Sequence, residues 1–368
     1  MKTTQSIPWW TPKLGGCEFD LVRQVLESNY LNEGDVATKF ENEIARLVGA
    51  RHAIAVTSGT SALFLSLAAL GIGHGDEVLV PDLTFIATAN AVTLSGATPV
   101  LVDVDPATLN VSVDAIARAI TPKTRAVIPV HVSGRAADMK AIADVCTARG
   151  IAIVEDAAEG FTSSAGGRCL GTFGVLGCFS FSPNKTITTG QGGAIVTSDD
   201  ALHVRLRELK DQGRPVRGTG GDDTHASVGF NFKLTNLQAA VGVGQLTYLP
   251  ERVARQRRIF ELYKEHLKGI PQVRLPGFDT AGGEIPQWTD AVVERRDELD
   301  RHLGAMGMQC RRFWHPLHTQ KPYLRPDGQF PHSTSVAPGT LWLPSAFTLR
   351  DEDVAAVSSE IRRFYARG

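Results

Sequence analysis

The rest of the chain is organised around the stretch Cys178-Phe-Ser-Phe-Ser-Pro-Asn-Lys-Thr-Ile-Thr-Thr-Gly-Gln-Gly-Gly193. It begins with an apolar, strand-like segment, passes through Lys185 and closes on a glycine-rich turn. Glycine permits tight turns and close backbone approaches, so this turn would hold Lys185 near the end of a core strand. A partly desolvated lysine is a nucleophile able to form a Schiff base. The alternative is a lysine whose stem covers apolar surface while its ammonium group reaches water.

The composition indicates a soluble globular protein of about two domains. The chain has 368 residues, of which 43% are hydrophobic, and a formal net charge of -1. So small a charge argues against nucleic-acid binding through bulk electrostatics. The 5 cysteines include no Cys-x-x-Cys pair, which favours a reduced, cytoplasmic protein over a disulfide framework or a zinc site. No apolar run is long enough to span a bilayer, so we expect no membrane association.

Short apolar segments alternate with helical patterns in the first part of the chain. The expected strands comprise residues 53–56, 77–80, 98–104, 126–132, 151–154, 178–181 and 194–197. The expected helices between them comprise residues 61–70, 85–94, 113–120 and 138–147. Near-continuous apolar strands are typical of a mainly parallel sheet with helices on both faces. The predicted fold class is therefore α/β.

Three parts are expected along the chain. Residues 1–50 would form an N-terminal arm with helices, residues 51–235 a large domain, and residues 236–368 bridging helices and a smaller α/β domain. Within the last part we expect helices at 236–248, 251–267, 297–306 and 351–365, and strands at 288–293 and 308–313. The glycine-rich residues 211–227 form either a lid over a site or a plain disordered loop.

Polar residues follow several of the expected strands, at the sheet edge where α/β proteins bind ligands. Thr57-Ser-Gly-Thr60 joins a strand to a helix, and its N–H groups and hydroxyls suit a phosphate. An ordinary helix N-cap has the same residues. Ser180 would either add a hydroxyl to that phosphate site or be a satisfied core serine.

Asp156 and Phe85 suit an aromatic ring. Asp156 ends a buried strand and would pair with a protonated ring nitrogen or form a structural salt bridge. Phe85 would stack on a ligand or pack in the core. Together with the imine-forming Lys185 and a phosphate at residues 58–60 and Ser180, they describe one ligand, pyridoxal 5'-phosphate (PLP). No metal site is expected, because the two histidines of His315-Pro-Leu-His318 lack a third ligand.

Five motifs occur in order along the chain, namely Ser58-Gly-Thr60, Pro81-Asp-Leu-Thr-Phe85, Glu155-Asp-Ala-Ala-Glu159, Ser180-Phe-Ser-Pro-Asn-Lys185 and Gly229-Phe-Asn-Phe-Lys-Leu-Thr-Asn-Leu-Gln-Ala-Ala240. With them the chain resembles, over essentially its whole length, the DegT/DnrJ/EryC1/StrS family of sugar aminotransferases. The resemblance implies the aspartate-aminotransferase type of fold (PLP fold type I) and a homodimer with shared active sites. It also implies transfer of an amino group from L-glutamate to a keto group of a nucleotide-linked sugar.

The same resemblance implies roles for individual residues. Lys185 would be the catalytic lysine that forms the imine, and Asp156 would bind the pyridine nitrogen. Glu159 would lie beside the cofactor ring. Asn231 would reach the cofactor phosphate of the partner subunit.

Within the family the similarity points to the perosamine-synthase group, through Phe313-Trp-His-Pro-Leu-His318 among other segments. It implies a 4-keto-6-deoxyhexose as acceptor and His315 as a sugar-site residue. The alternative within the family is a 3-keto sugar or a keto-cyclitol. The alternative from another class is a PLP-binding regulatory protein without turnover, against which the intact Lys185, Asp156 and Ser180 argue.

Overall fold

A seven-stranded sheet forms the centre of the computed structural model, which describes residues 6–215 and 223–367. Its order is β1-β9-β8-β5-β4-β2-β3. The strands are β1 (His52–Val56), β2 (Glu77–Pro81), β3 (Thr98–Val102), β4 (Thr124–Val127), β5 (Ala152–Asp156), β8 (Leu176–Ser180) and β9 (Gly193–Thr197). All neighbours pair in parallel except β9, which is antiparallel to β1 and β8. The predicted α/β class with a mainly parallel sheet is confirmed.

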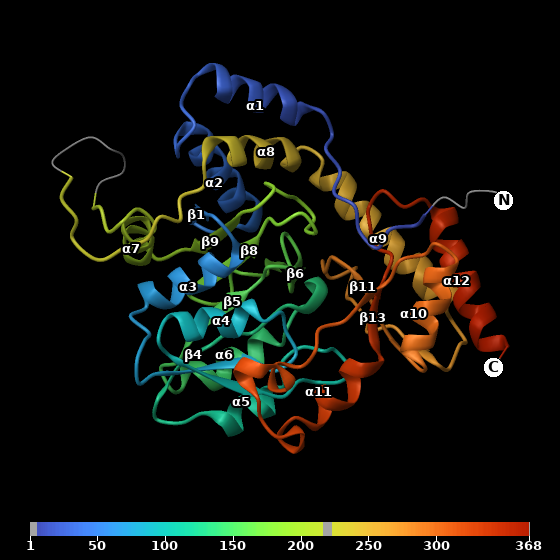
Figure 1. The fold of residues 1–368 in the computed structure, drawn as a ribbon. Helices are drawn as coiled ribbons and strands as arrows, with labels where there is room; N and C mark the ends of the chain where they lie inside the picture. Colours follow the sequence, from blue (N-terminus) through green and yellow to red (C-terminus); the bar gives the residue numbers. More distant parts are fainter. Residues whose placement is uncertain (1–5, 216–222, 368) are drawn as a thin grey trace.

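Helices cover both faces of this sheet (Figure 1). Side chains of a strand alternate between the faces. In β1, Ile54 and Val56 therefore join one apolar core, whereas Ala53 and Ala55 join the other. The first core is closed by α3 (Gly59–Ala69), α4 (Ala87–Leu94) and α7 (Asp200–Lys210). The opposite face is covered by α2 (Asp35–Val48), α5 (Val113–Ala119), α6 (Met139–Thr147) and α8 (Asn236–Leu246).

The large domain differs in places from the sequence expectation. The strand expected at residues 126–132 ends as β4 at Val127, because Pro129 has no N–H to donate to a ladder. The chain then forms a short 3₁₀ turn in which Ser133 has φ 54°. Helix α7 and the two-residue strands β6 (Ser164–Ala165) and β7 (Arg168–Cys169) were not expected.

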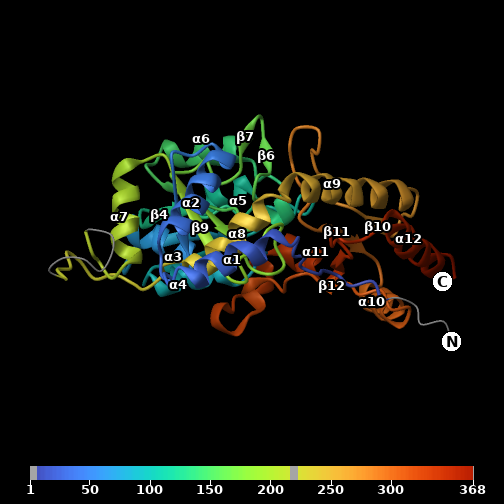
Figure 2. The ribbon, with the colours of Figure 1, turned by 90° about the horizontal axis from the view of Figure 1, so that it is seen from above.

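A four-stranded antiparallel sheet, in the order β10-β11-β13-β12, organises the smaller domain. Figure 2 shows β10, β11 and β12 on the same side of the molecule as α10 and α12. Its strands are β10 (Val273–Arg274), β11 (Thr289–Val293), β12 (Arg311–Arg312) and β13 (Thr340–Leu343). The helices of this part are α9 (Leu249–His266), α10 (Arg296–Ala305), α11 (Pro331–Val336) and α12 (Asp351–Ala366). Strand β13 was not expected, and the strand expected at 308–313 is only two residues long. Within the described residues, no helix combines the length and apolarity needed to cross a membrane.

The described N-terminal segment lies against the smaller domain before it reaches α1 (Cys17–Glu27), which packs on α8. Ile7 forms a parallel bridge with Met308. Trp9 packs on Trp288 and Trp342, with ring centres 5.5 and 6.0 Å apart. The segment thereby runs from the smaller domain to α8, which covers one face of the central sheet.

Candidate active site

A cavity of about 280 Å³ opens beside Lys185. Eight of the residues predicted from the sequence line it: Ser58, Gly59, Thr60, Phe85, Asp156, Glu159, Ser180 and Lys185. They lie at or just beyond the ends of β1, β2, β5 and β8. Because these strands run in the same direction, their carboxyl ends meet at one edge of the sheet.

The N-terminus of α3 forms one end of the cavity. Ser58 is the N-cap, and its Oγ accepts a hydrogen bond from the N–H of Ser61 at 3.1 Å. Ser61 Oγ accepts in turn from the N–H of Ser58 at 2.9 Å. The first N–H groups of a helix attract anions. A Cβ atom on Gly59 would stand 3.0 Å from Ser180 Cβ, so the Ser180 hydroxyl lies against the same turn.

Asp156 forms the opposite polar wall. Its side chain is buried, and Oδ2 accepts a hydrogen bond from Thr88 Oγ1 at 2.8 Å. Oδ1 accepts from the N–H of Ala158 at 3.2 Å. Burial raises the pKa of Asp156, while the bonds from Thr88 and Ala158 act in the opposite direction. A cation beside this carboxylate would stabilise its ionised form.

Lys185 lies between a carboxylate and an indole. Its Nζ is 3.4 Å from Glu159 Oε1 and 4.7 Å from the centre of the Trp288 ring. The lysine side chain is 11% exposed, which rules out the solvated lysine left open by the sequence. Burial raises the pKa of Glu159, and nearby Lys185 lowers it. The N–H of Ser133 donates to the other oxygen of Glu159 at 2.8 Å.

The backbone after Lys185 is fixed by side chains from distant elements. The N–H and Oγ1 of Thr186 donate to Gln287 Oε1 at 3.1 and 2.7 Å. Arg252 donates to the Thr186 carbonyl oxygen at 2.9 Å. Trp10 donates to the Pro183 carbonyl oxygen at 3.0 Å. The segment that carries Lys185 is therefore held by both domains and by the N-terminal segment.

Phe85 is open to the cavity. Its side chain is 53% exposed, so the core packing considered from the sequence is wrong for this residue. It stands beyond β2, before α4, and its carbonyl accepts from the N–H of Thr88 at 3.2 Å. An aromatic ring entering the cavity could stack on it.

Two predicted residues lie outside this cavity in the single chain. His315 is exposed and does not line it, whereas the preceding Trp314 does. Neighbouring side chains of an extended chain point to opposite sides, which accounts for this difference. Asn231 is exposed and pairs through its backbone with Asp211.

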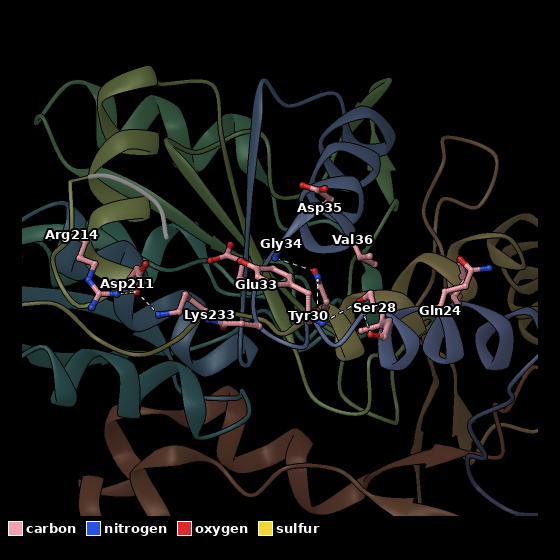
Figure 3. Close-up of a pocket in the computed structure, with 14 residues that line it drawn as sticks. Gln24, Ser28, Tyr30, Glu33, Gly34, Asp35, Val36, Asp211, Arg214 and Lys233 are labelled. Carbon is pink, nitrogen blue, oxygen red and sulfur yellow. Dashed lines mark hydrogen bonds and ion pairs between the residues drawn. The ribbon is translucent and has the colours of Figure 1, made fainter. Parts of the chain in front are cut away.

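Asp211 belongs to a larger hollow of about 690 Å³, between α1 with the turn after it and the residues Asp211, Arg214, Lys233 and Asn236 (Figure 3). Tyr30 and Lys233 also line this hollow, and Lys233 is paired with Asp211. The predicted loop 211–227 falls partly outside the described residues, at 216–222.

Sequence reasoning missed the wall that the smaller domain supplies. It consists of Trp288, Arg311, Trp314 and Trp342. The guanidinium of Arg311 lies over the rings of Trp9 and Trp342, at 4.8 and 5.5 Å from their centres. Among the described residues it forms no ion pair, so it can bind an anionic group of a substrate. Its place in the Arg-Arg pair of β12 gave no signal of this.

The residues of the cavity fit PLP. The α3 turn with Ser180 suits the phosphate, Phe85 the ring face and the buried Asp156 a protonated ring nitrogen. Lys185 is within the same cavity and is shielded from water. One end of the cavity therefore favours an anion and the other end favours a cation, which matches the phosphate and the protonated ring nitrogen of PLP.

Comparison with known proteins agrees with this site. A family model, the DegT/DnrJ/EryC1/StrS aminotransferase family, matches residues 12–362. GDP-perosamine synthase of Escherichia coli O157:H7 is 37% identical over 365 residues, which cover 98% of this chain and 99% of the relative. The dTDP-4-dehydro-2,3,6-trideoxy-D-glucose 4-aminotransferase of Saccharopolyspora spinosa is 35% identical over 368 residues, or 96% of this chain and 95% of the relative.

A solved structure is also similar over nearly its full length. The structure of S. venezuelae DesV in complex with a ketimine intermediate has a TM-score of 0.90, with 35% identity and 94% of each chain covered. The family match spans both domains and every segment that supplies a cavity residue. The chain therefore belongs to the DegT/DnrJ/EryC1/StrS aminotransferase family.

Proposed function

We propose that this PLP-dependent aminotransferase moves an amino group from L-glutamate to the keto carbon of a nucleotide-linked sugar, a 4-keto-6-deoxyhexose. The observation that carries the proposal is the position of Lys185 Nζ, 3.4 Å from Glu159 and inside the cavity that Asp156 and the α3 turn enclose. The names of the relatives above support the sugar-nucleotide acceptor and its 4-keto carbon.

PLP, when bound, supplies an electron sink that makes the Cα–H bond of an attached amino acid acidic. The phosphate would be held by Ser58, Gly59, Thr60 and Ser180, and the ring by Phe85 and Asp156. Asp156 keeps a positive charge at the ring end, since a buried carboxylate gains most from a cationic partner.

Lys185 Nζ would carry the proton. It would take the proton from Cα of glutamate and deliver it to C4' of the cofactor, and it would carry out the reverse transfer when the keto sugar receives the amino group. Glu159 Oε1 lies 3.4 Å from that amine and would orient it; burial raises the pKa of Glu159, and the nearby Lys185 lowers it. The indole ring of Trp288, whose centre is 4.7 Å from Lys185 Nζ, shields this amine from water. In balance, glutamate becomes 2-oxoglutarate and the keto sugar becomes an amino sugar.

We further propose that the enzyme is a homodimer in which Asn231 reaches the partner's cavity. Helix α1 and the turn after it expose Phe19, Leu26 and Tyr30, at 66%, 52% and 55%. Such an apolar surface favours contact with a second copy. Mixing Lys185→Ala and Asn231→Ala subunits would restore one intact site in each hybrid dimer. A fully active monomer would contradict the shared site.

The function is tested by the visible absorption of the protein with PLP, before and after L-glutamate. A band that shifts on adding glutamate establishes the first half-reaction. A panel of nucleotide-linked 4-keto and 3-keto sugars and a keto-cyclitol then identifies the acceptor. A band that forms and ignores glutamate would contradict this donor and favour the regulatory alternative.

A further inference from the structure

A separate cavity of about 450 Å³ lies at the start of α9 and shares no lining residue with the Lys185 cavity. We refer to it as the α9 cavity. Its wall includes four cationic side chains, Lys13, Arg252, Arg255 and Arg258, and one carboxylate, Glu251. The volume falls in the range of about 300–1,000 Å³ that is typical of small-molecule sites.

The three arginines form a row along α9. Residues three apart on a helix are neighbours on its surface, so Arg252, Arg255 and Arg258 face the same side. At about 1.5 Å of rise per residue the row extends over about 9 Å. That length exceeds a single phosphate and suits an anion with two linked phosphoryl groups.

Arg252 is a buried cation that forms no direct ion pair among the described residues, and its guanidinium lies against the rings of Phe347 and Tyr248, at 4.7 and 5.6 Å from their centres. It is 4% exposed, and Nη1 and Nη2 donate to the carbonyl oxygens of Thr186 and Lys13 at 2.9 and 2.7 Å. Its third partner, the side-chain oxygen of Gln245, is also neutral. Among the described residues no carboxylate forms an ion pair with it. Burial lowers the pKa of Arg252, and the carboxylates of Glu18 and Glu251, which lie beyond ion-pair distance, act in the opposite direction.

The four cations of the wall outnumber the two carboxylates beside them, that of Glu251 in the wall and that of Asp351. Arg255 and Arg258 share one carboxylate, that of Asp351. Nη2 of Arg255 is buried and has no hydrogen-bond partner within the described part of the chain. Lys13 likewise makes no ion pair there. A buried polar group of this kind is rarely left unsatisfied in proteins.

We propose that the α9 cavity is a second anion site, which binds a diphosphate group through Arg252, Lys13 and the free edge of Arg255. Guanidinium groups bind phosphoryl oxygens in a bidentate manner. The same chemistry is offered by inorganic pyrophosphate and by a nucleoside diphosphate. Because Arg252 also donates to the carbonyl of Thr186, the residue after Lys185, binding there is connected to the catalytic segment.

Isothermal titration of inorganic pyrophosphate into the PLP-loaded enzyme tests the site, since the cofactor's own phosphate then fills the α3 turn. We expect one site per chain, with orthophosphate binding at least tenfold more weakly. Lys13→Gln and Arg252→Gln should each weaken pyrophosphate binding at least tenfold. Lys13 is exposed, so its variant keeps the test valid if Arg252→Gln fails to fold.

The matched control is Lys264→Gln, which removes an exposed charge from α9 outside the cavity and should leave binding unchanged. A titration with GDP assigns the source: tighter binding than pyrophosphate, still lost in Lys13→Gln, indicates a nucleotide. Absence of binding at millimolar pyrophosphate would overturn the proposal. Binding that survives Lys13→Gln and disappears in Arg311→Gln would also overturn it, because the ligand would then occupy the Lys185 cavity.

Discussion

Thr88 Oγ1 donates a hydrogen bond of 2.8 Å to Asp156 Oδ2, and the two residues come from different layers of the large domain. Asp156 ends a strand of the central sheet, whereas Thr88 lies in the first turn of α4. Burial raises the pKa of Asp156, and this hydrogen bond lowers it. It thus helps to keep Asp156 ionised where a protonated ring nitrogen would lie.

Thr88→Val should weaken PLP binding at least about tenfold, since a hydrogen bond to a charged group contributes about 1.5–3 kcal/mol. The pKa of Asp156 would rise further above its ordinary value. Titrating the apoprotein with PLP and following absorbance gives the affinity. Thr93→Val is the control on the same helix, because Thr93 does not line the cavity. Equal affinity of Thr88→Val and the wild type would show that Asp156 does not hold the cofactor.

Lys185→Ala should reduce turnover by at least about a thousandfold, because it removes both the covalent anchor and the proton carrier. It also removes the cation beside Glu159, so the pKa of that carboxyl would rise further. Steady-state rates with glutamate and a keto sugar measure the loss. Lys264→Ala, on an exposed face of α9, should retain full activity. Substantial turnover by Lys185→Ala would refute the assigned mechanism.

Much of the cofactor end of the site could be predicted from the sequence. The turns that hold Ser58, Asp156 and Lys185 follow short apolar strands, and parallel pairing forces such turns to one edge. Each of these patterns lies within one short segment, so it can be recognised without knowing which other segments it contacts. The choice between a solvated and a buried Lys185 required the surrounding structure.

The substrate end could not be predicted in the same way. Trp314 reaches the cavity from the segment after β12, and Trp342 reaches it from β13, a strand that was not recognised at all. Its residues read Thr-Leu-Trp-Leu after Pro338 and Gly339, too short a run for a periodic pattern. Their contact with Lys185's cavity depends on how two domains dock, which no local pattern encodes.

Glu159 gives the apoprotein a distinctive pH dependence. Its pKa is raised in the folded state, so the folded protein keeps a proton that the unfolded chain releases. The folding free energy contributed by this group is present below its unfolded pKa and is lost as the pH rises towards the folded pKa. Glu159→Gln should therefore gain stability relative to the wild type as the pH rises above 4.5, the ordinary pKa of this group.

Urea unfolding of both apoproteins below and above that pH would measure the effect. Glu352→Gln, an exposed residue of α12, should run parallel to the wild type at every pH. A constant difference between Glu159→Gln and the wild type would mean that Glu159 does not titrate differently on folding.

Gly193 lets the backbone of β9 pack closely against the α3 turn at Ser58. A Cβ atom there would stand 2.5 Å from the carbonyl carbon of Ser58, which is backbone and cannot move aside cheaply. Gly193→Ala should cost about 1–3 kcal/mol of unfolding free energy and should weaken PLP binding with it. Gly304→Ala is the control, since no atom lies within 4 Å of its added Cβ and alanine favours a helix. Thermal unfolding with and without PLP separates the two effects, and an unchanged Gly193→Ala would contradict the close approach.

Trp314 and His315 are alternative candidates for the residue that contacts the sugar. Trp314 lines the cavity, whereas His315, the residue predicted from the sequence, is exposed in the single chain. Trp314→Ala should raise KM for the keto sugar about tenfold, with Trp314→Phe milder, because an indole face provides contact area to a sugar ring. KM for glutamate should change less. His315→Ala tests, in the same assay, whether His315 contacts the sugar instead. A rise in KM confined to His315→Ala would place the sugar against a surface that only a second subunit could close, and would make the dimer part of substrate recognition.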